Sequence, residues 1–160
     1  MELTELCSHE KKERGFKMTR INLVPVEELS DQHLIAEYKE LPRVVKQKIN
    51  IDGAPKKYTL GSGHVKWARL HLIFTLDRYY SVCTEMKRRG FSLQYQPDEL
   101  YICAMNQAYF SEYRWLHYVP TNEDIELSRN RIIEKIKLKP NWYKWTLREK
   151  PSYVKEMLNV

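Results

Sequence analysis

A single carboxylate stands among cationic side chains in a helix that the sequence predicts from Ser30-Asp31 to about Ile49. With about 100° of rotation per residue, Glu40 lies at the edge of a polar face that carries Gln32, Lys39, Arg43 and Lys46. A carboxylate in such a place can shuttle protons or stabilise positive charge, and its cationic neighbours can bind phosphate. A solvated helix surface shows the same pattern, so both interpretations stay open.

A second cationic group, with aromatic neighbours, follows closer to the C-terminus. Arg131 and Lys135 lie one turn apart on a helix predicted from Thr121 to Leu138, beside a stripe of isoleucines. The segment that follows, residues 141–145, reads Asn-Trp-Tyr-Lys-Trp. A lysine among aromatic residues suits phosphate contact combined with base stacking, although aromatic residues that close a small core explain the segment about as well.

Sequence signatures of metal or nucleotide chemistry are absent. There is no HExxH helix, phosphate-binding P-loop, dinucleotide-binding glycine motif or GxSxG elbow. Beyond the N-terminal tail, the histidines are scattered at His33, His64, His71 and His117. We expect them to cap helices or pack rather than bind metal. Three cysteines without CxxC spacing indicate a reducing compartment. We therefore expect no metal and no cofactor.

The overall composition limits the kind of protein this can be. A chain of 160 residues is long enough for one core and short for two, so we expect one site. Lys and Arg number 27 against 21 Asp and Glu, a net charge of +6 that attracts phosphate without proving nucleic-acid binding. No apolar run approaches the ~20 residues that cross a bilayer, and no secretory core is present. We expect a soluble, cytoplasmic protein.

Helices are the only regular elements that the sequence predicts, so the predicted class is all-α. Between the first helix, which contains Pro42, and the third, a central helix is expected from about His64 to Arg89, ending before Gly90. Its apolar residues cover more than one stripe: Val65, Leu70, Ile73, Phe74, Leu76, Tyr80, Val82 and Met86. Residues 91–120 are harder to interpret, with a short helix expected from Pro97 to Ala108. Residues 1–17 are interpreted as a charged tail outside the fold.

Residues 18–44, MTRINLVPVEELSDQHLIAEYKELPRV, closely resemble the start of the phage-type pyrimidine-dimer DNA glycosylases known as endonuclease V, including their algal-virus relatives. Further matching segments follow in the same order, up to about residue 146: Leu60 to Val65, Lys87 to Phe91, Tyr118 to Pro120 and Pro140 to Lys144. The resemblance implies a single compact domain, residues 18–160, of three main helices with long connecting loops.

The resemblance also implies an activity in two steps. A DNA glycosylase step removes the 5′ pyrimidine of an ultraviolet-induced cyclobutane dimer, and an abasic-site lyase step then cuts the strand by β-elimination. The nucleophile of the family is an N-terminal threonine amine, which maps to Thr19, and the essential carboxylate maps to Glu40. An α-amino group has a pKa of about 7.7–8.0, so a useful fraction is neutral and nucleophilic at physiological pH.

The implied partner is double-stranded DNA that contains pyrimidine dimers or abasic sites, bound by a monomer. The residues that match DNA contacts of the family are Arg20, Gln32, His33, Lys39, Arg43, Arg131, Lys135, Trp142, Tyr143 and Lys144. Lys39 replaces the arginine usual in the family, which keeps the charge but loses the two-pronged hydrogen bonding of a guanidinium. Trp145 replaces the usual tyrosine.

The 17 residues before Met18 bear directly on the implied mechanism. If they remain attached, the nitrogen of Thr19 belongs to a peptide bond and is no nucleophile. Three interpretations follow: translation begins at Met18, processing exposes Thr19, or the longer chain binds distorted DNA without cleaving it. We favour a start at Met18. A helical RNA-binding module is a more distant alternative.

Overall fold

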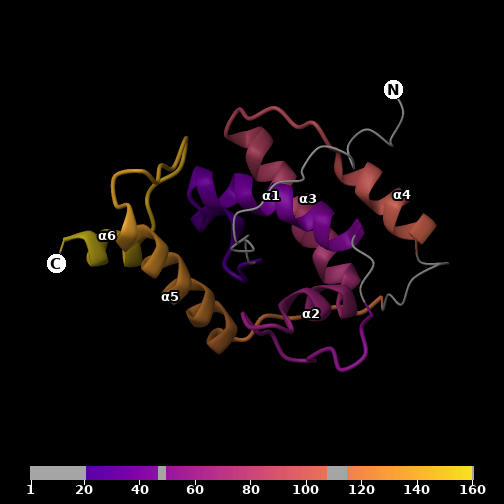
Figure 1. Cartoon of the computed structure of the whole chain (residues 1–160). Coiled ribbons are helices and arrows are strands. Elements are labelled where there is room, and N and C mark those ends of the chain that lie inside the picture. The colour runs from indigo at the N-terminus through magenta and orange to yellow at the C-terminus, as the bar shows by residue number, and fades with distance from the viewer. Residues whose placement is uncertain (1–20, 47–49, 108–114, 160) are drawn as a thin grey trace, which may run out of the picture.

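The computed structural model describes residues 21–46, 50–107 and 115–159. The predicted tail, together with Thr19 and Arg20, lies outside the described residues. The elements, in chain order, are a short 3-10 helix η2 (Val26–Glu28) and the α-helices α1 (Asp31–Lys46), α2 (His64–Leu70), α3 (Leu72–Arg88), α4 (Pro97–Gln107), α5 (Asn122–Leu138) and α6 (Ser152–Leu158) (Figure 1). The described part contains no β-strand, so the predicted all-α class is confirmed.

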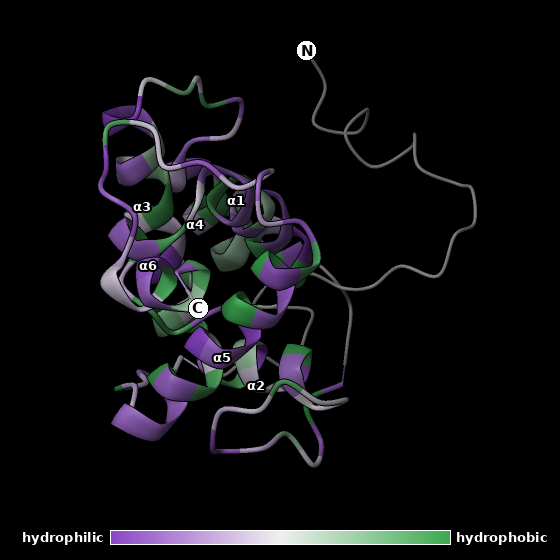
Figure 2. Ribbon diagram, turned by 90° about the vertical axis from the view of Figure 1, so that its left-hand side faces the viewer, coloured by the Kyte–Doolittle hydropathy of each residue, from purple (hydrophilic) through white to green (hydrophobic). Residues whose placement is uncertain are grey.

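Helix α3 is the central element, as the sequence predicts. It packs against α1, α2, α4 and η2, and it crosses behind α1 in the middle of Figure 1. In Figure 2 the hydrophobic stretches of these helices lie where the helices meet, and the hydrophilic stretches lie outside. The buried apolar residues form one cluster, to which α5 adds Ile132 and Ile136 and α6 adds Val154. Burial of this cluster is the main force that holds the helices together.

Helix α1 starts where the sequence predicts, and its apolar residues recur at the spacing of one buried helix face. Leu34, Leu41 and Val45 are fully buried. The hydroxyl of Ser30 accepts a hydrogen bond from the backbone N–H of His33 (3.2 Å), which is the side-chain cap expected at a helix N-terminus. The helix is described as far as Lys46, so its predicted end near residue 49 lies outside the described residues.

The predicted helix from His64 to Arg89 is wrong in one respect, because two helices occupy this range. The backbone leaves the helical conformation at His71 (φ −106°, ψ 57°), which pairs with Trp115 in an isolated β-bridge. The hydroxyl of Thr75 donates to the carbonyl oxygen of Ala68 (2.7 Å), the acceptor that a continuous helix uses for residue 72. At this break, the hydroxyl of Thr75 and the backbone of Trp115 thus take the place of helical hydrogen bonds.

Tyr80, one of the apolar residues predicted for the central helix, is exposed rather than buried. Buried positions of α3 recur every three or four residues, at Leu72, Thr75, Tyr79, Val82 and Met86. Tyr80 does not share that face, and its side chain is 62% exposed. The adjacent Tyr79 is the buried tyrosine because it, not Tyr80, falls in the repeat.

After α2, the predicted end of α3 and both predicted ends of α5 are confirmed, whereas the predicted helix end at Ala108 lies outside the described residues. Gly90 has a positive φ of 87°, and the N–H groups of Gly90 and Phe91 bond to the carbonyls of Lys87 and Met86, the two hydrogen bonds of a glycine-terminated helix. Thr121 and Asp124 form a reciprocal capping box at the start of α5. Helix α4 begins at Pro97 as expected. Helix α6 was not predicted.

Candidate functional site

The aromatic segment after α5 is tied to the first turn of α1 by the side chain of Gln32. The Gln32 side-chain nitrogen donates to the carbonyl oxygen of Trp142 (2.9 Å), and the backbone N–H of Lys144 donates to its oxygen (3.0 Å). The backbone N–H of Asp31 in turn donates to the carbonyl of Lys144 (2.7 Å). Gln32, predicted to contact DNA, therefore also shapes the loop that carries Trp142, Tyr143 and Lys144.

The far end of this loop is anchored to a buried cluster of charges. The carboxylate of Asp31 accepts from the backbone N–H and the hydroxyl of Thr146, and it pairs with the fully buried guanidinium of Arg89 (3.0 Å). Arg89 also pairs with Glu85 (2.8 Å), which binds Arg148 through both carboxylate oxygens. Burial alone raises the pKa of Glu85, but hydrogen bonds from Arg148 and Arg89 outweigh it and hold that pKa below its usual range.

His33 joins the loop to the two cations of α5. Its ring stacks on Tyr143, with ring centroids 4.8 Å apart and planes 12° from parallel. The hydroxyl of Ser30 lies 2.8 Å from its Nδ1. Burial, followed by the charges of Arg131 and Lys135, lowers the pKa of His33 to about 4. Neutral His33 thus lies within the electrostatic reach of both α5 cations, and these predicted site residues form one group in space.

The depressed pKa of His33 predicts a specific dependence of stability on pH. The unfolded chain protonates this ring near pH 6.5, whereas the folded protein does so only near pH 4. The contribution to the free energy of unfolding is therefore complete above about pH 6.5 and is lost on acidification to about pH 4, by up to about 3 kcal/mol. Urea denaturation at several pH values measures it.

The matched variants for this measurement are His33→Gln and His117→Gln, the second at an exposed position. We expect the His33 variant to lose the part of the acid destabilisation that this ring causes, and the His117 variant to keep it. An unchanged pH dependence in the His33 variant would contradict the prediction.

Glu40 occupies a different environment from the cations of its own helix. Its side chain is only 8% exposed, whereas that of Arg43, one turn further on, is 54% exposed, and their charged atoms lie 3.8 Å apart. Lys39 is exposed, and the ammonium of Lys46 lies 4.3 Å above the ring of Tyr95. The sequence placed Glu40 at the edge of a polar face, but the structure buries it, with the cationic surface beside it. The roles predicted for these residues stay predictions.

Another buried carboxylate lies on α1, at a position that the sequence pattern did not indicate. Glu37 is fully buried, one turn before Glu40. It pairs with the guanidinium of Arg78 (2.9 and 3.2 Å) and accepts the backbone N–H of Asn22 (2.9 Å). Its hydrogen bond with Asn22 fixes the backbone near the start of the described residues. Helical periodicity carries no signal for such a residue, because its partners come from other segments.

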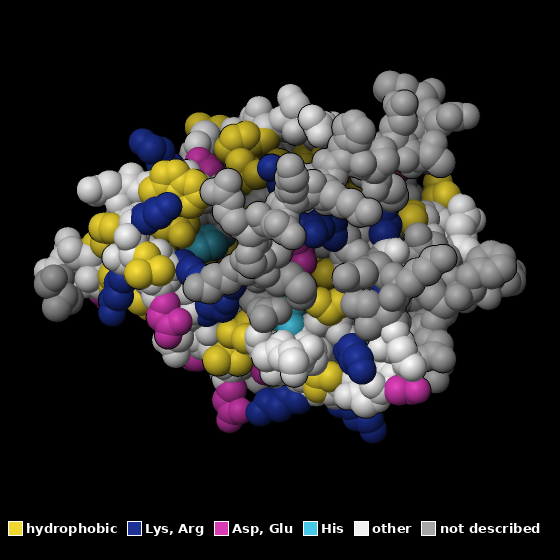
Figure 3. Space-filling view, in the orientation of Figure 1, with side chains coloured by type: hydrophobic (Ala, Val, Ile, Leu, Met, Phe, Trp, Pro, Cys, Tyr) yellow, Lys and Arg dark blue, Asp and Glu magenta, His cyan; other side chains and the backbone are white. Residues whose placement is uncertain are grey.

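On the face of the molecule that Figure 3 shows, the Lys and Arg side chains outnumber the acidic side chains that lie among them. Exposed aromatic surface lies near the cations: Trp142 is 55% exposed and packs edge-on against Tyr143, with the ammonium of Lys139 5.6 Å from its ring. Cations at this density suit phosphate groups, and an exposed indole suits stacking on a base.

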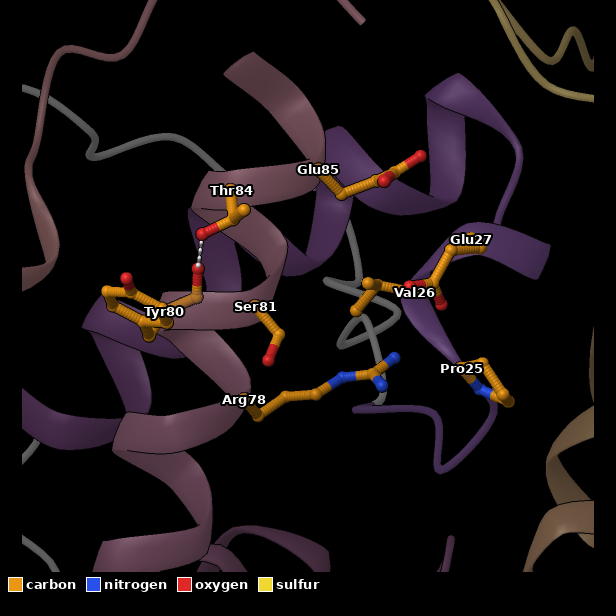
Figure 4. A pocket seen from close by; sticks show the side chains of 8 residues that line it. All are labelled: Pro25, Val26, Glu27, Arg78, Tyr80, Ser81, Thr84 and Glu85. Atoms are coloured by element: carbon orange, nitrogen blue, oxygen red, sulfur yellow. Dashed lines mark hydrogen bonds between the residues drawn. The ribbon is translucent and has the colours of Figure 1, made fainter. Parts of the chain in front are cut away.

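An open pocket lies away from these residues, between η2 and α3 (Figure 4). It is lined by Pro25, Val26, Glu27, Arg78, Tyr80, Ser81, Thr84 and Glu85. Its buried charged groups already have partners, because Arg78 pairs with Glu37 and Glu85 binds two arginines. None of the lining residues is among those predicted to react or to bind DNA. We therefore place the candidate site on the face of α1 and α5.

Two features are absent from the part of the chain that the structure describes. No helix there is long and apolar enough to cross a membrane. Within the same residues, no three His, Cys, Asp or Glu side chains lie together in a way that could hold a metal ion.

Comparison with protein families identifies a match for the N-terminal part of the chain. Residues 18–100, more than half of the sequence, match the model of a family described as pyrimidine dimer DNA glycosylase. The matched range contains all of α1, α2 and α3 and the start of α4. It ends before α5 and the aromatic loop. The contacts described above link these two elements to α1.

Proposed function

Because this chain belongs to the pyrimidine dimer DNA glycosylase family, we propose that it excises the 5′ pyrimidine of a cyclobutane dimer and then cleaves the strand as an abasic-site lyase. The family is one of DNA repair glycosylases that act on pyrimidine dimers. The proposal adds the lyase step and assigns the nucleophile to the α-amine of Thr19. The matched range begins at Met18, directly before this residue, which supports the assignment.

The proposed reaction starts with attack of the Thr19 nitrogen on C1′ of the damaged nucleotide. The N–C1′ bond forms as the glycosidic bond breaks, and the base leaves with the bonding electrons and takes up a proton. Loss of a proton from nitrogen and opening of the sugar then give an imine between the amine and C1′. The imine acidifies the hydrogen at C2′, so a base removes this proton and the 3′ phosphate leaves with the electrons of the C3′–O bond.

The observation that carries this proposal is the burial of Glu40 beside a cationic surface. A carboxylate removed from water interacts with a nearby cation more strongly than an exposed one does. Glu40 can therefore stabilise the positive charge of the protonated imine and carry the protons that sugar opening and elimination require. Arg43, at 3.8 Å, is exposed enough to contact DNA at the same time.

The group formed by His33, Arg131, Lys135 and the loop supplies the binding surface in this proposal. The two α5 cations neutralise phosphates, and Tyr143 is held in place by its stack on His33. Bending DNA costs less at a pyrimidine dimer than in intact duplex, because the damaged pairs stack and pair poorly. A rigid, cationic and aromatic surface that favours bent DNA therefore favours the lesion.

The test of this function is strand cleavage by protein that begins at Thr19, in the presence of EDTA. We expect ultraviolet-irradiated supercoiled plasmid to be nicked and unirradiated plasmid to stay intact, because imine chemistry uses a protein amine and needs no metal. Conversion of supercoiled to open-circular DNA on a gel measures the reaction. Plasmid treated with a photolyase, which reverses the dimers, is the matched control. Activity that disappears with EDTA would overturn the mechanism.

A further inference from the structure

The described chain begins with a segment held almost entirely by side chains from other parts of the molecule. Residues 21–24 form neither helix nor strand. Of their backbone N–H groups, that of Ile21 donates to His64 (2.9 Å), that of Asn22 to Glu37 (2.9 Å) and that of Leu23 to Ser128 (2.9 Å). Of their carbonyl groups, that of Ile21 accepts from Tyr58 and that of Val24 from Arg78.

The contact to His64 requires one particular form of its ring. Nδ1 lies 2.7 Å from the carbonyl oxygen of Thr59, which can only accept, so Nδ1 carries the proton. Nε2 is then an unprotonated acceptor for the N–H of Ile21. His64 is 1% exposed, so no water replaces either partner. The two hydrogen bonds together assign the neutral imidazole with its proton on Nδ1.

Tyr58 holds the carbonyl side of the same residue. Its hydroxyl donates to the carbonyl oxygen of Ile21 and accepts from the hydroxyl of Ser128 (3.3 Å). Burial raises the pKa of Tyr58, so the hydroxyl keeps the proton that it donates. The rings of Tyr58 and His64 meet edge to face, with centroids 5.7 Å apart. The two side chains therefore bind the N–H and the carbonyl group of Ile21, and their rings pack against each other.

We propose that His64 and Tyr58 are positioning residues for the reactive amine, an inference that rests on the function proposed above. Two residues of extended chain span at most about 7 Å. Fixing Ile21 therefore keeps the amine of Thr19, two residues earlier in the sequence, within that distance of the Ile21 backbone. Confinement of a nucleophile in a productive place lowers the entropic part of the barrier, and misplacement by about 1 Å can cost a factor of ~100. The two hydrogen bonds to Ile21 should therefore increase the rate of imine formation and leave DNA affinity unchanged.

The test compares three variants of the protein that begins at Thr19. His64→Leu removes the acceptor for Ile21, and His64→Gln keeps an oxygen acceptor at similar reach. His71→Leu is the matched control, because His71 is 5% exposed, also packs on Trp67 and donates from Nδ1 to the carbonyl of Trp67 (2.8 Å). Each is mixed with a saturating concentration of an oligonucleotide containing an abasic site, and the rate of borohydride trapping is measured beside its dissociation constant.

We expect His64→Leu to trap the DNA at least about tenfold more slowly with nearly unchanged affinity, His64→Gln to recover much of the rate, and His71→Leu to match the parent protein. Equal slowing by His71→Leu would show a general loss of packing and overturn the proposal. If His64→Leu does not fold, judged by its thermal transition, Tyr58→Phe removes the second contact and keeps the ring. The same slowing is expected, and an unchanged rate would overturn the proposal.

The same experiment separates this inference from the proposed function. Absence of trapping in the parent protein would show that the amine assignment fails. Normal trapping in the parent together with an unchanged rate in His64→Leu would leave that assignment standing and remove the positioning role alone.

Discussion

Protein that begins at Thr19 is expected to form a covalent complex with damaged DNA that borohydride makes permanent, whereas the full 160-residue chain is expected to form little or none. In the shorter protein the Thr19 nitrogen is a primary amine and can form an imine. In the longer chain it is an amide, which has no nucleophilic lone pair. The amine of Met1, 18 residues before Thr19 in the sequence, lacks the proximity that the reaction needs. Denaturing gel electrophoresis of reduced complexes measures the difference.

Both proteins should still bind damaged DNA, because the cations of α1 and α5 are present in each. A binding assay on the same oligonucleotide is therefore the control that separates loss of chemistry from loss of affinity. Mass spectrometry of the crosslinked peptide identifies the reacting nitrogen. Efficient crosslinking through a lysine or through Met1 in the full chain would contradict the assignment of Thr19.

Replacement of Glu40 by glutamine should abolish strand cleavage and leave binding of damaged DNA largely intact. The amide keeps the size and shape of the buried side chain, but it neither shuttles protons nor balances the charge of a protonated imine. Loss of a general acid–base group lowers a rate by about 10²- to 10⁴-fold, and loss of charge stabilisation adds to this effect. Single-turnover nicking of an abasic-site oligonucleotide measures the rate, and a filter-binding titration measures affinity.

Glu134→Gln is the matched control for this variant. Glu134 is exposed on α5, and its replacement makes the same change in net charge. Any general increase in DNA affinity from the lost negative charge is then common to both variants. Near-normal cleavage by Glu40→Gln would remove Glu40 from the site, and equal losses in the two variants would point to net charge instead of position.

The features predicted correctly from the sequence are those whose causes are local. The buried apolar positions of α1 follow from helical spacing, the start of α5 from a threonine followed three residues later by an aspartate, and the end of α3 from Gly90. Each signal involves residues within one or two turns, where helical geometry decides which groups meet. The all-α class follows because such signals recur along the chain without a competing strand pattern. The family resemblance added the candidate site residues, which spacing alone left open.

The departures from prediction arise where distant residues compete with local preference. Nothing near His71 marks a helix break, and the structure places it where Trp115 pairs with its backbone. Tyr80 and Tyr79 are adjacent and chemically alike, so composition could not choose between them. By its sequence pattern Gln32 is a polar surface residue, yet its side-chain amide forms hydrogen bonds to a loop more than one hundred positions later in the chain.

By itself, then, the sequence determined the helical class, several helix boundaries and the family. Tertiary structure decided the surroundings of the proposed chemistry: the burial of Glu40, the neutral form of His33 and the side-chain hydrogen bonds to residues 21–24. The physical reason is that these properties depend on groups that only folding brings together. A pKa responds to charges and desolvation from every nearby element. The hydrogen bonds of an irregular segment are made by whichever side chains packing delivers to it, and no local periodicity records them.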